Sequence, residues 1–106
     1  MESLTNMAFK DLNQLVDDIA ERFFQTRQNH SFLDDDNPTN IQDETIYLSK
    51  VQKAYDSLSD SEKNLINNEF FYQSYSWWWK AIYSKATFYR YKKEAMRKFL
   101  EAFYNE

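Results

Sequence analysis

The chain has 106 residues and a formal net charge of −4, with no cysteine, no glycine and one proline. This length suits a single domain, and the missing cysteines exclude disulfides and thiolate metal sites. The missing glycines disfavour hairpins and tight turns, while 42% hydrophobic residues suffice for a core. We therefore expect one all-α domain over residues 1–106.

No stretch of about 18 apolar residues occurs, so neither a transmembrane helix nor a membrane partner is expected. The N-terminal residues lack the basic start and apolar block of a signal peptide. We therefore expect a cytoplasmic location.

The charge is distributed unevenly along the chain. Residues 1–79 carry six Lys/Arg and fourteen Asp/Glu, a net charge of −8. Residues 80–98 carry seven Lys/Arg and one Glu, a net charge of +6. An acidic protein thus contains a basic segment, and this asymmetry favours a polyanionic partner.

Hydrophobic spacing predicts a first amphipathic helix over residues 4–28, capped by Ser3 or Thr5. Its apolar positions are Leu4, Ala8, Leu12, Leu15, Val16, Ile19, Phe23 and Phe24. The polar stretch 29–40, which contains the only proline, is predicted to be a loop.

A second helix is predicted over about 41–57, because Thr39 and Gln42 have the spacing of a capping box. Its inward-facing residues are Tyr47, Leu48, Val51, Ala54, Tyr55 and Leu58. The N-terminal pair of helices, within residues 1–57, is expected to complete the core. The alternative is that the first helix exposes its apolar stripe to another protein or to a second copy, forming a homodimer.

The C-terminal part, residues 58–106, is predicted to hold three more helices, giving about five in all. Ser59-Asp-Ser-Glu62 is a capping box that opens a helix over about 60–73. The apolar face of that helix comprises Leu65, Ile66, Phe70 and Phe71. The last helix is predicted over about 84–104, with Ser84 as its cap.

A short helix around 75–82 is predicted to contain Trp77, Trp78 and Trp79. Successive helical residues are about 100° apart, so three consecutive rings cannot all face one way. We expect two of them to pack in the core and one to cover a seam. The alternative is an exposed ring that contacts a protein partner or a phosphate. Stacking on nucleic-acid bases is a further alternative, which binding to a duplex disfavours.

The last helix has an apolar stripe that we expect to be buried, made of Phe88, Tyr91, Ala95, Phe99 and Ala102. A second, cationic stripe consists of Lys85, Tyr89, Lys93 and Arg97, with Ala86 and Arg90 beside it. Such a helix fits a DNA major groove, where its N-terminal end meets base edges and its later cations meet phosphates. The alternative is that these charges only solvate the outer face of a bundle, and periodicity does not decide between the two.

Residues 58–99 resemble a helix-turn-helix of the sigma-factor region 4 type, which is also found in small phage late transcription regulators. The likeness lies in Leu58-Ser-Asp-Ser-Glu62 and in Tyr83-Ser-Lys-Ala-Thr-Phe-Tyr-Arg-Tyr-Lys-Lys-Glu-Ala95. Between these motifs, Trp77-Trp-Trp-Lys-Ala-Ile82 replaces the polar helix and the glycine turn of that family. The chain also resembles small uncharacterised mollicute proteins with a similar Trp-rich stretch.

The resemblance implies that Ser84 caps a recognition helix. It implies contacts with the base edges of double-stranded DNA for Lys85, Ala86 and Tyr89. It implies contacts with the DNA backbone for Thr87, Arg90, Lys93 and Arg97. The implied function is that of a DNA-binding transcription regulator, with RNA polymerase or another protein as an open further partner. The alternative is a protein-interaction module that binds a transcription component through the three tryptophans and the acidic helices.

No catalytic or metal-binding pattern stands out. His30 is the only histidine, and a zinc site would need further His or Cys ligands. The acidic residues Asp34, Asp35, Asp36, Asp43 and Glu44 do not follow the order of a calcium loop. We therefore expect neither enzymatic activity nor a metal or cofactor.

Overall fold

The computed structural model describes residues 6–32, 38–72 and 77–104, except for the side chains of 29–32 and 38–42. The described residues form helices and turns and contain no β-strand. The elements are α1 (Phe9–Phe32), α2 (Pro38–Asp56), α3 (Asp60–Ile66), the π-helical turn η2 (Asn67–Phe71) and α4 (Lys85–Tyr104). The all-α prediction is confirmed, with four α-helices in the described residues instead of five. None of the described helices is both long and apolar enough to cross a membrane.

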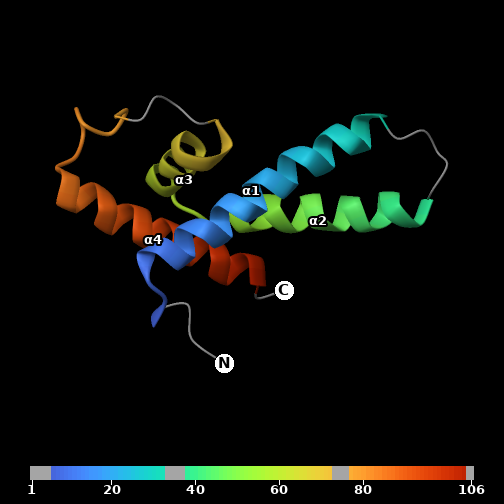
Figure 1. The fold of residues 1–106 in the computed structure, drawn as a ribbon, viewed down its shortest axis with the longest axis horizontal. Helices are drawn as coiled ribbons and strands as arrows, with labels where there is room; N and C mark the ends of the chain where they lie inside the picture. The colour runs from blue at the N-terminus through green and yellow to red at the C-terminus, as the bar shows by residue number, and fades with distance from the viewer. Residues whose placement is uncertain (1–5, 33–37, 73–76, 105–106) are drawn as a thin grey trace.

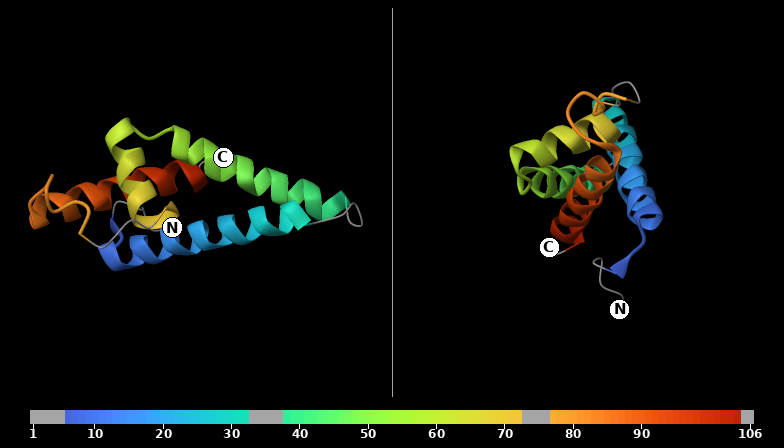
Figure 2. Two further views of the ribbon diagram at one scale, coloured as in Figure 1. Left: turned by 90° about the horizontal axis from the view of Figure 1, so that it is seen from above. Right: turned by 90° about the vertical axis from the view of Figure 1, so that its left-hand side faces the viewer.

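The helices α1 and α2 contact each other. Seen from above they converge toward the end of α1 and the start of α2, whereas in the view of Figure 1 they cross (Figures 1 and 2). At their separated ends, α4 lies between them and contacts both, and α3 packs on α4. The central element of the fold is therefore α4.

The helices α1 and α2 together form an arm that elongates the molecule. The Cα radius of gyration of the molecule is 15.2 Å, whereas a compact chain of 100 residues has about 13 Å.

Hydrophobic burial fixes the position of α4. Its fully or almost fully buried side chains are Phe88, Ala95, Met96, Phe99 and Leu100. They belong to one cluster with residues of α1, α2 and α3, namely Leu12, Val16, Val51, Ala54, Leu65 and Ile66. Full burial of one large apolar side chain contributes about 1.5–3 kcal/mol. The four helices therefore depend on the same core.

Side-chain caps set the start of two helices. The Ser59 hydroxyl accepts from the Glu62 backbone N–H at 3.3 Å, and the Glu62 carboxylate accepts from the Ser59 N–H at 2.9 Å. The Ser84 hydroxyl accepts from the Thr87 N–H at 3.2 Å. The predicted capping box of α3 and the predicted cap of α4 are both confirmed.

The first helix begins later than predicted. It starts at Phe9 instead of residue 4, and Ala8, which was placed on its apolar stripe, is exposed. The expected caps Ser3 and Thr5 lie outside the described residues. The apolar pattern is confirmed further along the helix, where Leu12, Val16 and Ile19 are buried.

The predicted loop over 29–40 is shorter in the structure. Residues 29–32 continue α1 and residues 38–40 begin α2, whereas 33–37 lie outside the described residues. Pro38 occupies the first helical position, where its missing N–H would have had no helical acceptor. Thr39 therefore lies inside α2, and the capping box predicted there is not the start of the helix.

The short helix predicted around 75–82 is wrong where the structure describes it. Residues 77–82 form turns, closed by the Trp77 carbonyl accepting from the Lys80 N–H at 3.1 Å and by the Trp79 carbonyl accepting from the Ile82 N–H at 2.9 Å. We call residues 77–83 the tryptophan turn. The Trp79 ring stacks on the Phe88 ring at 4.5 Å between centroids, so contacts with α4 replace the regular hydrogen bonding of a helix.

The expected division of the tryptophans is confirmed in part. Trp78 is buried and Trp79 is partly buried against the core. Trp77, by contrast, is 64% exposed, which is the exposure that the alternative required. The apolar stripe predicted for the last helix is wrong at Tyr91, which is 45% exposed. The buried face of α4 is instead completed by Met96, Leu100 and Phe103.

Replacing Phe99 by alanine should lower the free energy of unfolding by about 3–5 kcal/mol, because a fully buried ring leaves a cavity at the centre of the core. Urea denaturation followed by circular dichroism measures this loss. Lys93→Ala, at an exposed position of the same helix, is the control and should change stability by about 0.5 kcal/mol or less. Similar stabilities for the two variants would contradict the central place of α4.

Candidate nucleic-acid interface

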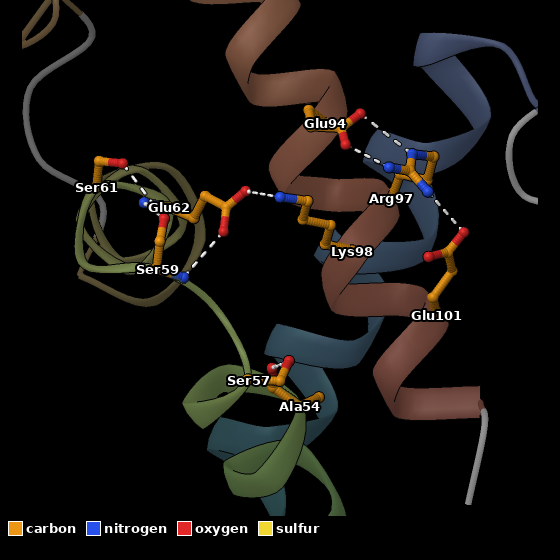
Figure 3. A network of polar contacts seen from close by, with 9 residues as sticks. All are labelled: Ala54, Ser57, Ser59, Ser61, Glu62, Glu94, Arg97, Lys98 and Glu101. Carbon is orange, nitrogen blue, oxygen red and sulfur yellow. Dashed lines mark hydrogen bonds and ion pairs between the residues drawn. The ribbon is translucent and has the colours of Figure 1, made fainter.

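The second half of α4 directs its cations toward glutamates of the same chain, as Figure 3 shows. Arg97 lies between two residues of its own helix. It contacts the Glu94 carboxylate, and its Nη1 lies 2.7 Å from Oε1 of Glu101. Lys98 Nζ lies 2.9 Å from Oε2 of Glu62 and thereby links α4 to α3. A phosphate would have to compete with two carboxylates for Arg97.

These contacts shift the carboxylate pKa values. Burial raises the pKa of Glu62, but hydrogen bonds from the Ser59 backbone N–H, from Lys98 and from the Ser59 hydroxyl outweigh it and bring the pKa below its ordinary value of 4.5. The hydrogen bond from Arg97 lowers the pKa of Glu94. Carboxylates of this kind stabilise the fold above their ordinary pKa, and this stabilisation is lost as the pH falls through the folded-state pKa.

Glu69 of η2 connects the tryptophan turn to α4. Its Oε1 lies 2.7 Å from Lys92 Nζ, and its Oε2 accepts a hydrogen bond from Trp78 Nε1 at 2.7 Å. The side chains of Lys92 and Glu69 are only 12% and 15% exposed. Removal of either partner would leave the other charge shielded from water without compensation, which lowers the free energy of unfolding.

The first half of α4 and the tryptophan turn carry a different set of cations. These are Lys80, Lys85, Arg90 and Lys93, which we call the basic face. All four are exposed, and none forms an ion pair with a carboxylate in the part of the chain that the structure describes. The guanidinium of Arg90 lies 5.4 Å from the Tyr91 ring centroid, and Lys80 Nζ lies 4.7 Å from that of Trp77. The basic face therefore remains accessible to an external anion.

The residues expected at base edges differ in their surroundings. Lys85 and Ala86 are exposed on the first turn of α4. Tyr89 is 42% exposed, and its ring lies edge-on to that of Phe9 at 5.4 Å. The tyrosine therefore also joins α1 to α4, which limits how far its ring can move toward a ligand.

The residues expected at the DNA backbone also fall into two groups. Arg90 and Lys93 are exposed, whereas the Thr87 hydroxyl accepts a hydrogen bond from the Ser84 hydroxyl at 2.9 Å and belongs to the helix cap. Arg97 is held by its two glutamates. The structure thus leaves Arg90 and Lys93 accessible and gives Thr87 and Arg97 internal contacts.

The segment that precedes α4 differs from that of the usual helix-turn-helix. In that motif a turn of three or four residues joins two helices. Here η2 ends at Phe71, and the described residues 77–84 before α4 contain no helix. The rings of Trp78 and Trp79 instead pack on Phe88, at centroid distances of 5.9 and 4.5 Å. In the described residues, the tryptophan turn packs on the N-terminal half of α4.

The sequence analysis did not single out two residues of this region. Lys80 belongs to the exposed basic face, and Glu69 joins the tryptophan turn to α4. A signal for Glu69 was present, because it is the only carboxylate between residues 63 and 93. Among the described residues, no group of three or more His, Cys, Asp or Glu could hold a metal ion. The side chain of His30 lies outside the description.

Comparison of the chain with protein-family models, curated proteins and solved structures found no match. The resemblance to sigma-factor region 4 therefore stays a prediction.

Replacing Glu69 by alanine should lower the free energy of unfolding by about 3 kcal/mol or more, because it leaves the shielded Lys92 ammonium without its carboxylate. Glu101→Ala, which removes a more exposed member of an ion pair, is the control and should cost about 1 kcal/mol or less. The double variant Glu69→Ala/Lys92→Met should recover part of the loss in urea denaturation. Equal effects of the two single variants would rule out a structural role for Glu69.

The lowered pKa of Glu62 predicts a contribution to stability that is present at neutral pH and lost below about pH 4.5. In Glu62→Gln this contribution is absent, so the free energy of unfolding should fall less steeply between pH 6 and pH 3, as measured in about six buffers. Asp17→Asn, on the exposed face of α1, serves as the control and should follow the wild-type slope. A Glu62→Gln slope that matches the wild type would contradict the assignment.

Proposed function

We propose that this protein binds double-stranded DNA through the basic face and regulates transcription. One observation carries the proposal: the cations of residues 80–98 fall into two sets. Lys92, Arg97 and Lys98 are neutralised by glutamates of the chain, whereas the four cations of the basic face have no carboxylate partner among the described residues. Cations that neutralise phosphates release condensed counterions, and this release drives binding to DNA.

The position of α4 supports this proposal. Its N-terminal end, which carries Lys85, Ala86 and Arg90, projects away from the arm of α1 and α2 (Figure 1). A helix fits into the major groove, which is about 12 Å wide. The helix dipole also places partial positive charge at this end, which favours a nearby phosphate.

The charge of the rest of the chain supports an end-on orientation. Asp11, Asp17, Asp18 and Glu21 are exposed on this helix. The same helix also exposes Lys10, Arg22 and Arg27, so its net charge is −1 and it repels phosphates only weakly. The net charge of −4 of the whole chain disfavours non-specific contact over the rest of the surface. Binding is therefore favoured at the end of the molecule that bears the basic face.

A second candidate function is recognition of a transcription protein by the same end of the molecule. The observation that favours it is the exposure of two large apolar side chains in the tryptophan turn, Trp77 at 64% and Ile82 at 62%. Aromatic residues are enriched at the centres of protein interfaces. Salt dependence separates the two candidates, since phosphate contacts produce a steep dependence and an apolar interface does not.

Fluorescence anisotropy with a labelled duplex should show salt-sensitive binding with a dissociation constant of about 1–100 μM or tighter near physiological salt. Lys93→Ala should weaken binding on all duplexes alike and reduce the slope of log K against log salt by about 0.9, the value for one phosphate contact. Lys85→Ala should in addition relax the preference among duplex sequences, since this position faces the bases in the proposal.

Lys98→Ala is the matched control, because it removes the same charge from the same helix at a position already paired with Glu62. Its affinity and salt slope should stay close to those of the wild type. A wild-type protein that binds no duplex at low salt would refute DNA binding and favour the protein-interaction candidate.

A further inference from the structure

The tryptophan turn projects apolar side chains directly beside the basic face. Trp77 and Ile82 are both more than 60% exposed and flank Lys80 in the chain. The other large rings of the turn are covered, since Trp78 is buried and Trp79 stacks on Phe88. Among the three tryptophans, only the indole of Trp77 is therefore exposed.

The residues of the turn from Trp77 onward are held by several contacts. The neighbouring Trp78 donates its indole N–H to Glu69 at 2.7 Å, and the Trp77 carbonyl accepts from the Lys80 N–H at 3.1 Å. The Trp79 and Phe88 rings are nearly parallel, with an interplanar angle of 6°. Because these contacts already hold the described residues of the turn, stacking of a ligand on Trp77 loses less conformational entropy than stacking on a ring without such support.

A cation accompanies the exposed ring. Lys80 Nζ lies 4.7 Å from the centroid of the Trp77 ring. An aromatic platform with a cation at its edge or face is the combination with which proteins bind single-stranded nucleic acid, because the ring stacks on a base while the cation meets the adjacent phosphate. The four cations of the basic face make an anionic polymer the partner that matches this surface.

We infer that Trp77 stacks on an unpaired base, so that the preferred ligand of the basic face is DNA in which a duplex adjoins an unpaired segment. This inference rests on the proposed function. In an uninterrupted duplex the flat faces of the bases are stacked on one another, and an indole reaches them only after costly unstacking. An unpaired base offers its face without that cost, while the adjoining duplex still engages α4.

Two labelled DNAs with the same number of phosphates test the inference, one fully paired and one paired over half of its length with a single-stranded extension. The wild type should bind the extended DNA more tightly in fluorescence anisotropy. Trp77→Ala should weaken binding to the extended DNA at least about fivefold and change binding to the paired DNA less than about twofold. Trp77→Phe should retain most of the preference, because a phenyl ring also stacks.

Tyr104→Ala is the matched control, since Tyr104 is another exposed ring, 53% exposed, at the opposite end of α4. It should leave both affinities unchanged. Equal affinities of the wild type for the two DNAs, or an unchanged preference in Trp77→Ala, would overturn the inference and leave duplex binding intact. Failure of the wild type to bind either DNA would overturn the proposed function together with the inference.

Discussion

The two contacts of the Glu69 carboxylate hold the tryptophan turn and α4 together with η2. The carboxylate accepts from Lys92 of α4 and from Trp78 of the tryptophan turn, so one side chain of η2 joins two segments that are distant from it in the chain. A shielded carboxylate is tolerated only when its hydrogen bonds are satisfied. Glu69 therefore disfavours any packing of the turn or of α4 that would separate it from Trp78 or Lys92. The π-helical turn from which Glu69 projects is a rare geometry that occurs often near functional sites.

The single helix α4 combines three kinds of surface. Its apolar face, centred on Ala95 and Phe99, forms the middle of the core. Its cations Lys92, Arg97 and Lys98 form ion pairs that hold the fold, whereas its other cations are exposed and have no carboxylate partner among the described residues. The overall acidity of the chain hides this division, because charge summed over the whole sequence does not report which cations already have internal partners.

Local patterns predicted the parts of the fold that depend on neighbours in the chain. The caps at Ser59 and Ser84 and much of the buried face of each helix follow from spacings of three and four residues. Even the pairing of Arg97 could be read from the sequence, since Glu94 and Glu101 lie three residues before it and four residues after it. The tryptophan turn could not, because its conformation depends on the contacts of Trp78 with Glu69 and of Trp79 with Phe88, which no periodic pattern in the sequence indicates.

The arm of α1 and α2 extends beyond the core at the end opposite the basic face (Figure 1). The described side chains of α1 after Thr26 and of α2 before Tyr47 include none that is buried. Matched insertions or deletions of whole turns in both helices would therefore change the reach of the arm by about 5.4 Å per turn and leave α4 undisturbed. The length of the arm can therefore vary while the structure of the basic face stays the same.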